Sequence, residues 1–332
     1  MKALVFEAPN QPAIHDLPQP TIDDTQVLIR TRAVGICHSD YELLYGRYII
    51  PISYPVTPGH EWVGEVVEVG RSVKGFRPGE RVVGECVVRL PDRVHHFGFS
   101  LDGADREYFA ARPEWLHKLP DTLPDATGSM VEPFTCGYYA IRNIGGTDAS
   151  QTVVISGGGT IGLVTAAAAI GMRARVIVID PIAHRREAAL RLGCAAAIDP
   201  LAEDAVARVE DLTGGARADL VVEASGHDSS LGTVFDLARQ DGRVAMVGIN
   251  IGRRIPSHLG NIQMRNLTVK GSIGSPGVWP DAIRFLEQTR IDLSPIQTHE
   301  FPLTDAVNAF ALGKQADQCI KVTLHNTAET VR

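Results

Sequence analysis

Cysteine is scarce in this 332-residue chain, and its five copies, at positions 37, 86, 136, 194 and 319, form no CxxC pair. An odd number of widely spaced cysteines excludes the disulfide framework of a small secreted domain. The first residues, MKALVFEAP, hold only four consecutive apolar residues before Glu7, which is too few for the core of a signal peptide. We therefore expect a cytoplasmic protein.

Runs of like charge and low-complexity tracts are also absent. The net charge of -7 and the isoelectric point near 5.9 argue against a nucleic-acid partner, which would require clustered Lys and Arg. Residues 152–172 carry no charge over a length that could span a bilayer. Three consecutive glycines interrupt this stretch and its second half is rich in alanine, so it predicts a strand, a turn and a buried helix instead of a membrane span.

The length of the chain predicts two domains, because one hydrophobic core rarely organises more than about 250–300 residues. Up to residue 125 the apolar runs are short, valine-rich and separated by Gly and Pro, which predicts a β-rich, barrel-like domain. Strands and helices then alternate, with helices expected at 183–193 and 229–240, and this predicts a doubly wound parallel sheet. A helix near WPDAIRFLEQ and a closing strand, IKVTLHN, are expected to return to the first domain.

A glycine-rich turn lies at residues 153–162, VVISGGGTIG, with the spacing G-x-G-x-x-G after a predicted strand and before a predicted helix. Glycines there let a pyrophosphate approach the backbone, and the helix N-terminus supplies amide donors. Asp180 ends the next strand, where a carboxylate binds the ribose hydroxyls and repels a 2′-phosphate, which favours NAD. Arg185 and Arg186 could accommodate a phosphate and leave NADP open. The alternative is a packing turn, with Asp180 as a helix cap.

Candidate metal ligands are spread along the chain. Cys37 lies in GICHSD, and 23 residues later PGHEW holds the adjacent His60 and Glu61. A thiolate, an imidazole and one or two carboxylates can hold a four-coordinate zinc, and fewer than four fixed ligands leave a position open for chemistry. Glu132, in MVEPF, could reach a cleft between the two domains. Singly, these residues are also typical of a buried thiol, a hydrogen-bonded histidine or surface charges, and spacing alone does not prove that they converge.

Several motifs occur in the order and spacing of zinc-dependent medium-chain dehydrogenases: GICHSD, PGHEWVGEVVEVG, VKGFRPGERVV, VEPF, GGGTIG, VVEASG and GRVAMVGI. The likeness covers nearly the whole chain, and DLSPIQTHEFPLTDAVNAF is most similar to the tail of the threonine and sorbitol dehydrogenase branch. The resemblance implies a GroES-like β-barrel catalytic domain, residues 1–125 completed by 270–332, and a Rossmann NAD-binding domain, residues 126–269. It also implies a homodimer or homotetramer.

The resemblance assigns roles to individual residues. It places a catalytic zinc among Cys37, His60, Glu61 and Glu132. Glu61 is then either a ligand or one that exchanges with water. Ser39 resembles the hydroxyl that takes the alcohol proton, and Asp40 the carboxylate that orients the liganding histidine. The implied cofactor contacts are Gly157, Gly159, Thr160, Ile161, Gly162, Asp180, Arg185 and Glu223.

Two departures from the family pattern matter. Glu42 stands where the family often has a histidine at the outer end of the proton relay, so either Glu42 or solvent completes the relay, or Glu42 is a surface residue. Residues 84–109 contain only Cys86, where many relatives hold a structural zinc with four cysteines. We therefore expect one catalytic zinc and no structural zinc.

Together these patterns predict an NAD-linked zinc dehydrogenase that oxidises a secondary hydroxyl to a ketone, with zinc as the Lewis acid and the nicotinamide as the hydride acceptor. Polar candidates near the site favour a hydroxyl-rich or amino-bearing substrate: a polyol, an amino alcohol, or an aminocyclitol of the 2-deoxy-scyllo-inosamine type. One alternative is a zinc-free quinone or enoyl reductase using NADPH, which would not need Cys37, His60 and Glu132 together. The other is a catalytically silent nucleotide-binding protein.

Overall fold

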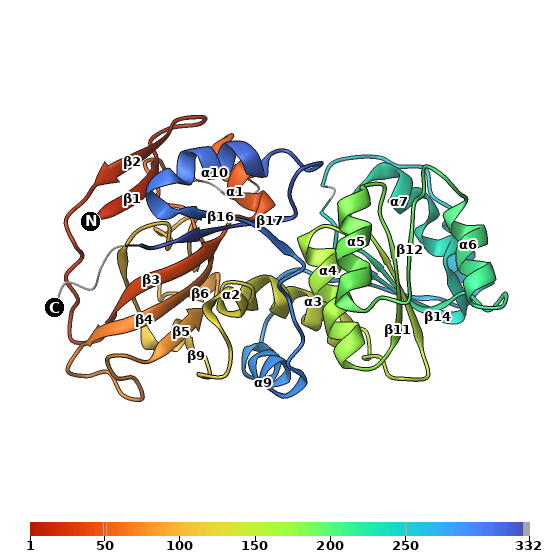
Figure 1. The fold of residues 1–332 in the computed structure, drawn as a ribbon, viewed down its shortest axis with the longest axis horizontal. Helices are drawn as coiled ribbons and strands as arrows, with labels where there is room; N and C mark the ends of the chain where they lie inside the picture. Colours follow the sequence, from red (N-terminus) through yellow and green to blue (C-terminus); the bar gives the residue numbers. More distant parts are fainter. Residues whose placement is uncertain (49, 51, 250, 328–332) are drawn as a thin grey trace. The chain divides into compact units, whose positions relative to one another are not determined.

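The computed structural model describes residues 1–48, 50, 52–249 and 251–327. The chain divides into two compact units, one made of Met1–Glu132 with Gln297–Arg332 and the other of Pro133–Ile296. Within the first unit, the blue C-terminal strands lie beside the red N-terminal strands (Figure 1). The end of the chain therefore completes the unit that its beginning forms.

The first unit is rich in β-structure. Its strands are β1 (Lys2–Phe6), β2 (Pro12–Asp16), β3 (Val27–Gly35), β4 (Glu61–Val69), β5 (Arg81–Gly84), β6 (Val87–Arg89), β7 (Val94–His96), β8 (Tyr108–Ala111), β9 (Leu116–Lys118), β16 (Gln297–Pro302) and β17 (Lys321–His325). Its helices are α1 (His38–Leu44), α2 (Asp125–Gly128) and α10 (Ala306–Gly313), while α3 (Val131–Asn143) begins here and continues into the second unit. The main sheet has the order β16-β17-β3-β4-β5-β9, and β8 also pairs with β3.

Three neighbouring strands of this sheet bring distant segments together. The valine-rich β3 and β4 are antiparallel, with Gly35 opposite Glu61. On its other side β3 pairs with β17, so that Thr323 also lies opposite Gly35. Because both strand pairs are antiparallel, the end of β3 meets the starts of β4 and β17 at one edge. That edge carries the candidate metal ligands.

The second unit contains a parallel sheet with helices between its strands. Its strands are β10 (Thr152–Ser156), β11 (Arg175–Ile179), β12 (Ala196–Ile198), β13 (Ala218–Glu223), β14 (Ala238–Met246) and β15 (Thr268–Gly271). Its helices are α4 (Thr160–Gly171), α5 (Ala183–Leu192), α6 (Ala205–Leu212), α7 (Asp228–Thr233), α8 (Gly260–Met264) and α9 (Trp279–Thr289). The order β12-β11-β10-β13-β14-β15, parallel throughout, confirms the predicted doubly wound sheet.

One predicted helix of this unit is wrong at its C-terminal end. The expected helix over 229–240 is α7 followed by a short 3-10 turn at Val234–Asp236, and β14 already begins at Ala238. Ala238 pairs with Ala218 of β13, and a register shift separates this pair from the rest of the ladder. Strand pairing therefore overrides the helical propensity of residues 238–240, as tertiary context commonly does.

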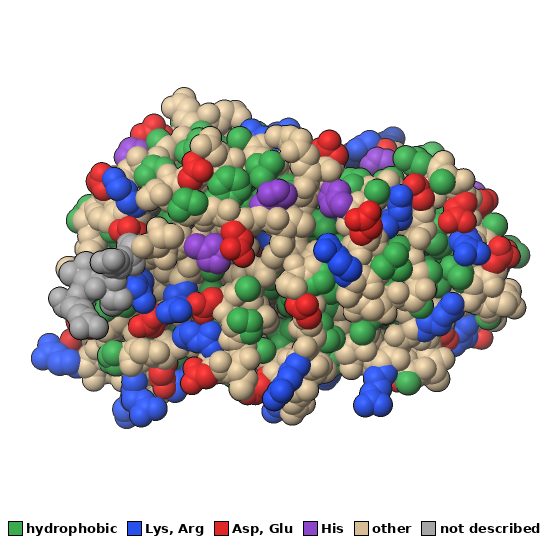
Figure 2. Space-filling model, in the orientation of Figure 1, with side chains coloured by type: hydrophobic (Ala, Val, Ile, Leu, Met, Phe, Trp, Pro, Cys, Tyr) green, Lys and Arg blue, Asp and Glu red, His purple; other side chains and the backbone are tan. Residues whose placement is uncertain are grey.

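The charge-free stretch at 152–172 forms β10, the glycine turn and the buried helix α4, as predicted. Among the described helices, none combines the length and apolar character needed to cross a lipid bilayer. Acidic and basic side chains are interspersed over the visible face of the molecule (Figure 2). The four strands β10, β11, β13 and β14 supply the centre of the unit's core, including Val154, Ile177, Val221 and Val244.

Candidate functional site

Cys37, His60 and Glu61 form a compact group, in which each offers a ligand atom within 4.8 Å of the others. It is the one such group of three among the residues that the structure describes. Cys37 follows the end of β3 and caps α1, whereas His60 and Glu61 stand at the start of β4. His60 and Glu61 are only 4% and 1% exposed. The β3–β4 pairing therefore produces the convergence that sequence spacing alone did not prove.

Asp40 ties this group together from the first turn of α1. One carboxylate oxygen accepts a hydrogen bond from the Cys37 backbone N–H at 2.8 Å, and the other lies 3.2 Å from Nδ1 of His60. Burial alone would lower the pKa of His60, but Asp40, together with two nearby cysteines, raises that pKa well above the ordinary value. With Nδ1 turned to Asp40, Nε2 of His60 is the nitrogen left for a metal. This is the orienting position expected for Asp40.

Lys321, at the start of β17, was not predicted as part of the site. Its ammonium donates to the Glu61 carboxylate and, at 2.9 Å, to the backbone carbonyl of Ile36. Both side chains of the ion pair are almost fully buried, at 2% and 1% exposure. Burial would lower the pKa of Lys321, but Glu61, together with the nearby Cys37 and Asp40, raises it above its ordinary value. The closing strand, KVTLH, alternates polar and apolar residues, so no pattern in the sequence indicated that its lysine is buried.

Glu132, near the start of α3, is not a member of this group of three, but its carboxyl group interacts with the charges of the site. Burial raises the pKa of Glu132 to about 7, and the charges of His60, Glu61 and Lys321 also act on it. Glu132 is thus part of the same charged neighbourhood without contributing to the close cluster. Of the two predicted carboxylate ligands, Glu61 belongs to the group whose ligand atoms lie within 4.8 Å of one another.

The two residues expected in the proton relay occupy different environments on α1. Ser39 is partly buried in the first turn, two residues after Cys37. Glu42 lies a turn further on, where it accepts a hydrogen bond from Arg47 at 2.9 Å and is 4.0 Å from His38. The partners described for Glu42 therefore lie on the solvent-exposed side of α1.

An aromatic wall that sequence reasoning missed borders His60. The ring of Phe99 lies 4.8 Å from that of His60, and Tyr48 stacks on Phe99 at 4.4 Å and 10°. The Cys86 thiol is also nearby; burial raises its pKa to about 12, so it is a neutral thiol.

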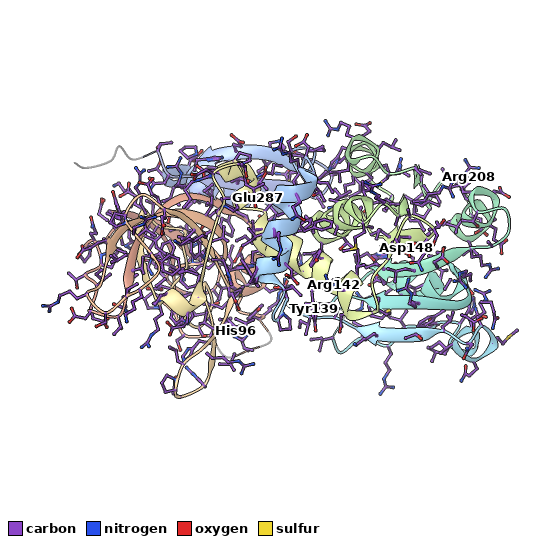
Figure 3. All side chains as sticks on the ribbon, turned by 90° about the horizontal axis from the view of Figure 1, so that it is seen from below. His96, Tyr139, Arg142, Asp148, Arg208 and Glu287 are labelled. Atoms are coloured by element: carbon purple, nitrogen blue, oxygen red, sulfur yellow. The ribbon has the colours of Figure 1, made fainter. Side chains whose placement is uncertain are left out.

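His96, labelled in Figure 3, lies on β7 of the short β6–β7 hairpin. This hairpin occupies the region expected to lack a structural zinc.

The glycine turn has the geometry of a dinucleotide-binding loop. Gly157 has φ of +108°, and its α-carbon faces Ser225 so closely that no β-carbon could be accommodated. A β-carbon on Gly162 would overlap the carbonyl oxygen of Gly157, whereas the space around Gly159 is open. Helix α4 begins directly afterwards at Thr160, so its N-terminal amides face the turn.

Asp180 follows β11 and lies beside this turn. Its carboxylate accepts hydrogen bonds from the backbone of Gly158 at 2.7 Å and of Ile182 at 2.8 Å. Arg185 approaches the same carboxylate at 3.6 Å. Arg186 donates to the Asp180 carbonyl and pairs with Asp199 at 2.8 Å. Both guanidinium groups that could accommodate a phosphate are thus engaged by acidic or carbonyl oxygens.

Glu223, at the end of β13, is completely buried. Its carboxylate accepts hydrogen bonds from the backbone of Ser225 and Gly226 and from the hydroxyls of Ser225 and Ser230. This residue, which the motif VVEASG brought into the expected cofactor set, organises the turn that packs against Gly157.

Comparison with known proteins assigns both units. Residues 160–288 match the model described as zinc-binding dehydrogenase, and residues 23–121 match the alcohol dehydrogenase GroES-like domain. The chain is 32% identical to the sorbitol dehydrogenase of Halalkalibacterium halodurans, over 94% of this chain and 95% of the relative. It is also 32% identical to the D-arabitol-phosphate dehydrogenase of Enterococcus avium, over 99% and 98%. The solved structure of a Sinorhizobium meliloti zinc-binding dehydrogenase bound to NADP has a TM-score of 0.91 and 28% identity, covering 98% of both chains.

The chain belongs to the zinc-dependent medium-chain alcohol dehydrogenases, in the branch of the polyol dehydrogenases. It is an oxidoreductase that acts on alcohols with zinc and a nicotinamide cofactor, and the predicted combination of a GroES-like domain with a Rossmann-type sheet is confirmed. The residues present fit the metal, because sulfur, imidazole nitrogen and carboxylate oxygen are donors that zinc prefers, gathered here in a largely buried group.

Proposed function

We propose that the protein oxidises a secondary hydroxyl of a polyol, amino alcohol or aminocyclitol to a ketone, with NAD as the hydride acceptor. The observation that carries this proposal is the Cys37–His60–Glu61 group, because three donors leave room for a substrate at a four-coordinate metal. Sorbitol and arabitol phosphate, the substrates named for two relatives, support a hydroxyl-rich molecule. Zinc, when bound there, supplies a Lewis acid that lowers the pKa of the alcohol.

The protein's own residues prepare this reaction. Asp40 fixes the ring of His60 through Nδ1, which presents Nε2 to the metal. Ser39, partly buried two residues after Cys37, accepts the alcohol proton and passes it toward solvent along α1. Phe99 and Tyr48 form an apolar wall beside His60 that limits the access of water.

NAD is proposed over NADP because of the groups around Asp180. A carboxylate at the end of the second strand of such a sheet favours ribose hydroxyls and repels a 2′-phosphate. Arg185 and Arg186 are already engaged by Asp180 and Asp199, which leaves them less suited to a phosphate. We further propose one zinc per chain, since the described residues hold a single group of candidate ligands.

A substrate screen tests these proposals together. With the zinc-loaded protein, we expect polyols, amino alcohols or aminocyclitols to reduce NAD with a kcat/KM at least about tenfold above that for a plain aliphatic alcohol, because a site that hydrogen-bonds extra hydroxyls discriminates strongly. The same assays with NADP should give a lower kcat/KM. Turnover restricted to enones or quinones with NADPH, or none with any substrate class, would contradict the proposal.

We also propose that the protein is cytoplasmic and acts on small molecules alone. None of its five cysteines, all within the described residues, forms a disulfide, which suits a reducing compartment. The interspersed charges of the visible face provide no basic track for a nucleic acid there (Figure 2).

A homo-oligomer is the remaining proposal, and the edge of the parallel sheet supports it. All four residues of β15 are exposed, and Met264 and Ile273, which flank it in the chain, are 79% and 71% exposed. An open edge strand beside exposed apolar side chains is suited to pairing with a second copy. We expect Val269→Asp on β15 to lower the mass measured by light scattering about twofold, as a buried charge opposes association. The matched change Val67→Asp, at an exposed valine of β4, should leave the mass unchanged; equal masses for both variants and the unaltered protein would exclude this edge.

A further inference from the structure

Glu223 is a buried carboxylate without a cationic partner. Its side chain has no exposed surface, and four donors meet its Oε1 atom at 2.6 to 3.0 Å: the backbone N–H groups of Ser225 and Gly226 and the hydroxyls of Ser225 and Ser230. Donors of this kind stabilise the ionised form of a carboxyl group. Among the described residues, no lysine, arginine or histidine forms an ion pair with it. Buried charges are normally paired, so this carboxylate is unusual.

The sheet topology places Glu223 on the side of one particular half of a dinucleotide. The order β12-β11-β10-β13-β14-β15 changes direction between β10 and β13, and such sheets bind ligands outside the carboxyl ends of their strands at that point. Ser156 ends β10, and its hydroxyl lies 2.7 Å from that of Ser230, so one hydrogen-bond chain joins both strand ends to Glu223. Asp180, after β11, marks the adenosine side. The nicotinamide half therefore belongs on the side of β13 and β14, where Glu223 lies.

The two oxygens of the carboxylate have different surroundings. Oε1 receives the four donors, whereas the contact given for Oε2 is a second, longer share of the Gly226 N–H at 3.2 Å. Gly248, which follows β14, makes room for Oε2, because a β-carbon on that glycine would overlap this oxygen. The hydrogen bonds that organise the turn therefore depend mainly on Oε1, and the charge itself has no partner that the turn requires.

We propose that Glu223 discriminates between the oxidised and the reduced cofactor, because its carboxylate attracts the positively charged nicotinamide ring of NAD⁺ and has no such attraction for the neutral ring of NADH. This inference rests on the nicotinamide-linked function proposed above. The oxidised ring supplies the cation that the described residues do not. Glu223 therefore favours the uptake of NAD⁺ and the release of NADH, and product release limits turnover in many enzymes.

The variant that tests this proposal is Glu223→Gln. It removes the charge, and its amide oxygen can keep the four donors of Oε1 while the amide nitrogen replaces Oε2. On the zinc-loaded protein, we expect the NAD⁺ dissociation constant measured by calorimetry to rise about tenfold, the order of one unit-charge interaction at an effective dielectric constant of about 20. The dissociation constants of NADH and of ADP-ribose, which lacks the nicotinamide, should change by less than about twofold, since neither carries the ring charge.

Two matched variants separate the charge from the geometry of the turn. Ser230→Ala removes one donor and keeps the charge, so it should change the affinities for NAD⁺ and NADH by the same factor. Asp219→Asn removes a carboxylate that is paired with Arg239 near the opposite end of β13. It should leave the ratio of the NAD⁺ and NADH dissociation constants unchanged.

A cofactor analogue provides the test if Glu223→Gln does not fold. In the analogue, benzamide replaces nicotinamide, so the ring keeps its shape and loses its charge. The unaltered protein should bind NAD⁺ at least about threefold more tightly than this analogue, because only NAD⁺ interacts with the carboxylate as a cation. Equal affinities would overturn the inference.

The outcomes separate this inference from the function on which it depends. An unaltered protein that binds neither NAD⁺ nor NADH would remove the proposed function itself. If that protein binds both and oxidises polyols, but Glu223→Gln weakens NAD⁺ and NADH equally, Glu223 acts only on the turn and the discrimination proposal is overturned. An equal loss of affinity for ADP-ribose would likewise overturn it, because the effect would then lie outside the nicotinamide half.

Discussion

Replacing Cys37 by alanine should remove the metal from the active site and with it the oxidation of alcohols. Cys37 supplies the sulfur donor of the three-residue group, and loss of residues that merely support a metal ligand already costs about 10–100-fold in metal affinity or activity. We expect a loss of more than about a hundredfold in Zn²⁺ affinity and a larger loss of turnover. Metal analysis after dialysis, with about one zinc per chain in the unaltered protein by the single-site argument, checks this result.

The matched control is Cys319→Ala, which removes a buried thiol of the same unit that packs in the hydrophobic core around Phe310 and Leu324. That variant should keep its zinc and lose only some stability. NAD affinity should change little in Cys37→Ala, because the glycine turn and Asp180 belong to the other unit. A Cys37→Ala protein that retains stoichiometric zinc would refute the ligand assignment.

The sequence predicted the glycine turn from its spacing, and it predicted the metal ligands through the family resemblance. The grouping of Cys37 with His60 was predicted from the family resemblance, and the structure gives its physical reason: the end of β3 meets the start of the antiparallel β4. The repeated strand–helix pattern is strongly periodic, and it correctly predicted the parallel sheet. Family resemblance then gave Asp40 its orienting role, and the structure places its carboxylate 3.2 Å from His60.

Residues that reach the site through pairing between distant strands were not predicted from the sequence. Lys321 is separated from Glu61 by 260 positions, and its place in the site depends on β17 pairing with β3. Nothing local distinguishes it from a lysine on a solvent-facing strand, since burial is a property of the packed sheet. The strand at 238–240 was missed for the same reason, because its pairing with β13 is decided by tertiary contacts.

Gly162→Ala should destabilise the second unit and abolish dinucleotide binding. A β-carbon there would overlap the carbonyl oxygen of Gly157, a backbone atom that cannot rotate away, so α4 must move relative to the turn after β10. Overpacking of this kind typically costs about 1–3 kcal/mol, and a rigid backbone neighbour favours the upper end. The midpoint of denaturant unfolding and the NAD dissociation constant measure the two effects.

Gly159→Ala is the informative counterpart, because a β-carbon at this position would have no atom within 4 Å and its φ of -71° is ordinary for alanine. Its stability should match that of the unaltered protein within about 0.5 kcal/mol, as for a substitution without strain. NAD binding should nevertheless weaken, since the methyl group occupies the space through which a pyrophosphate approaches the turn. The pair thus separates the two reasons for glycine: Gly162 allows the helix to pack closely on the turn, and Gly159 allows the cofactor to reach it. Equal NAD affinity in Gly159→Ala and the unaltered protein would mean that the dinucleotide does not bind over this turn.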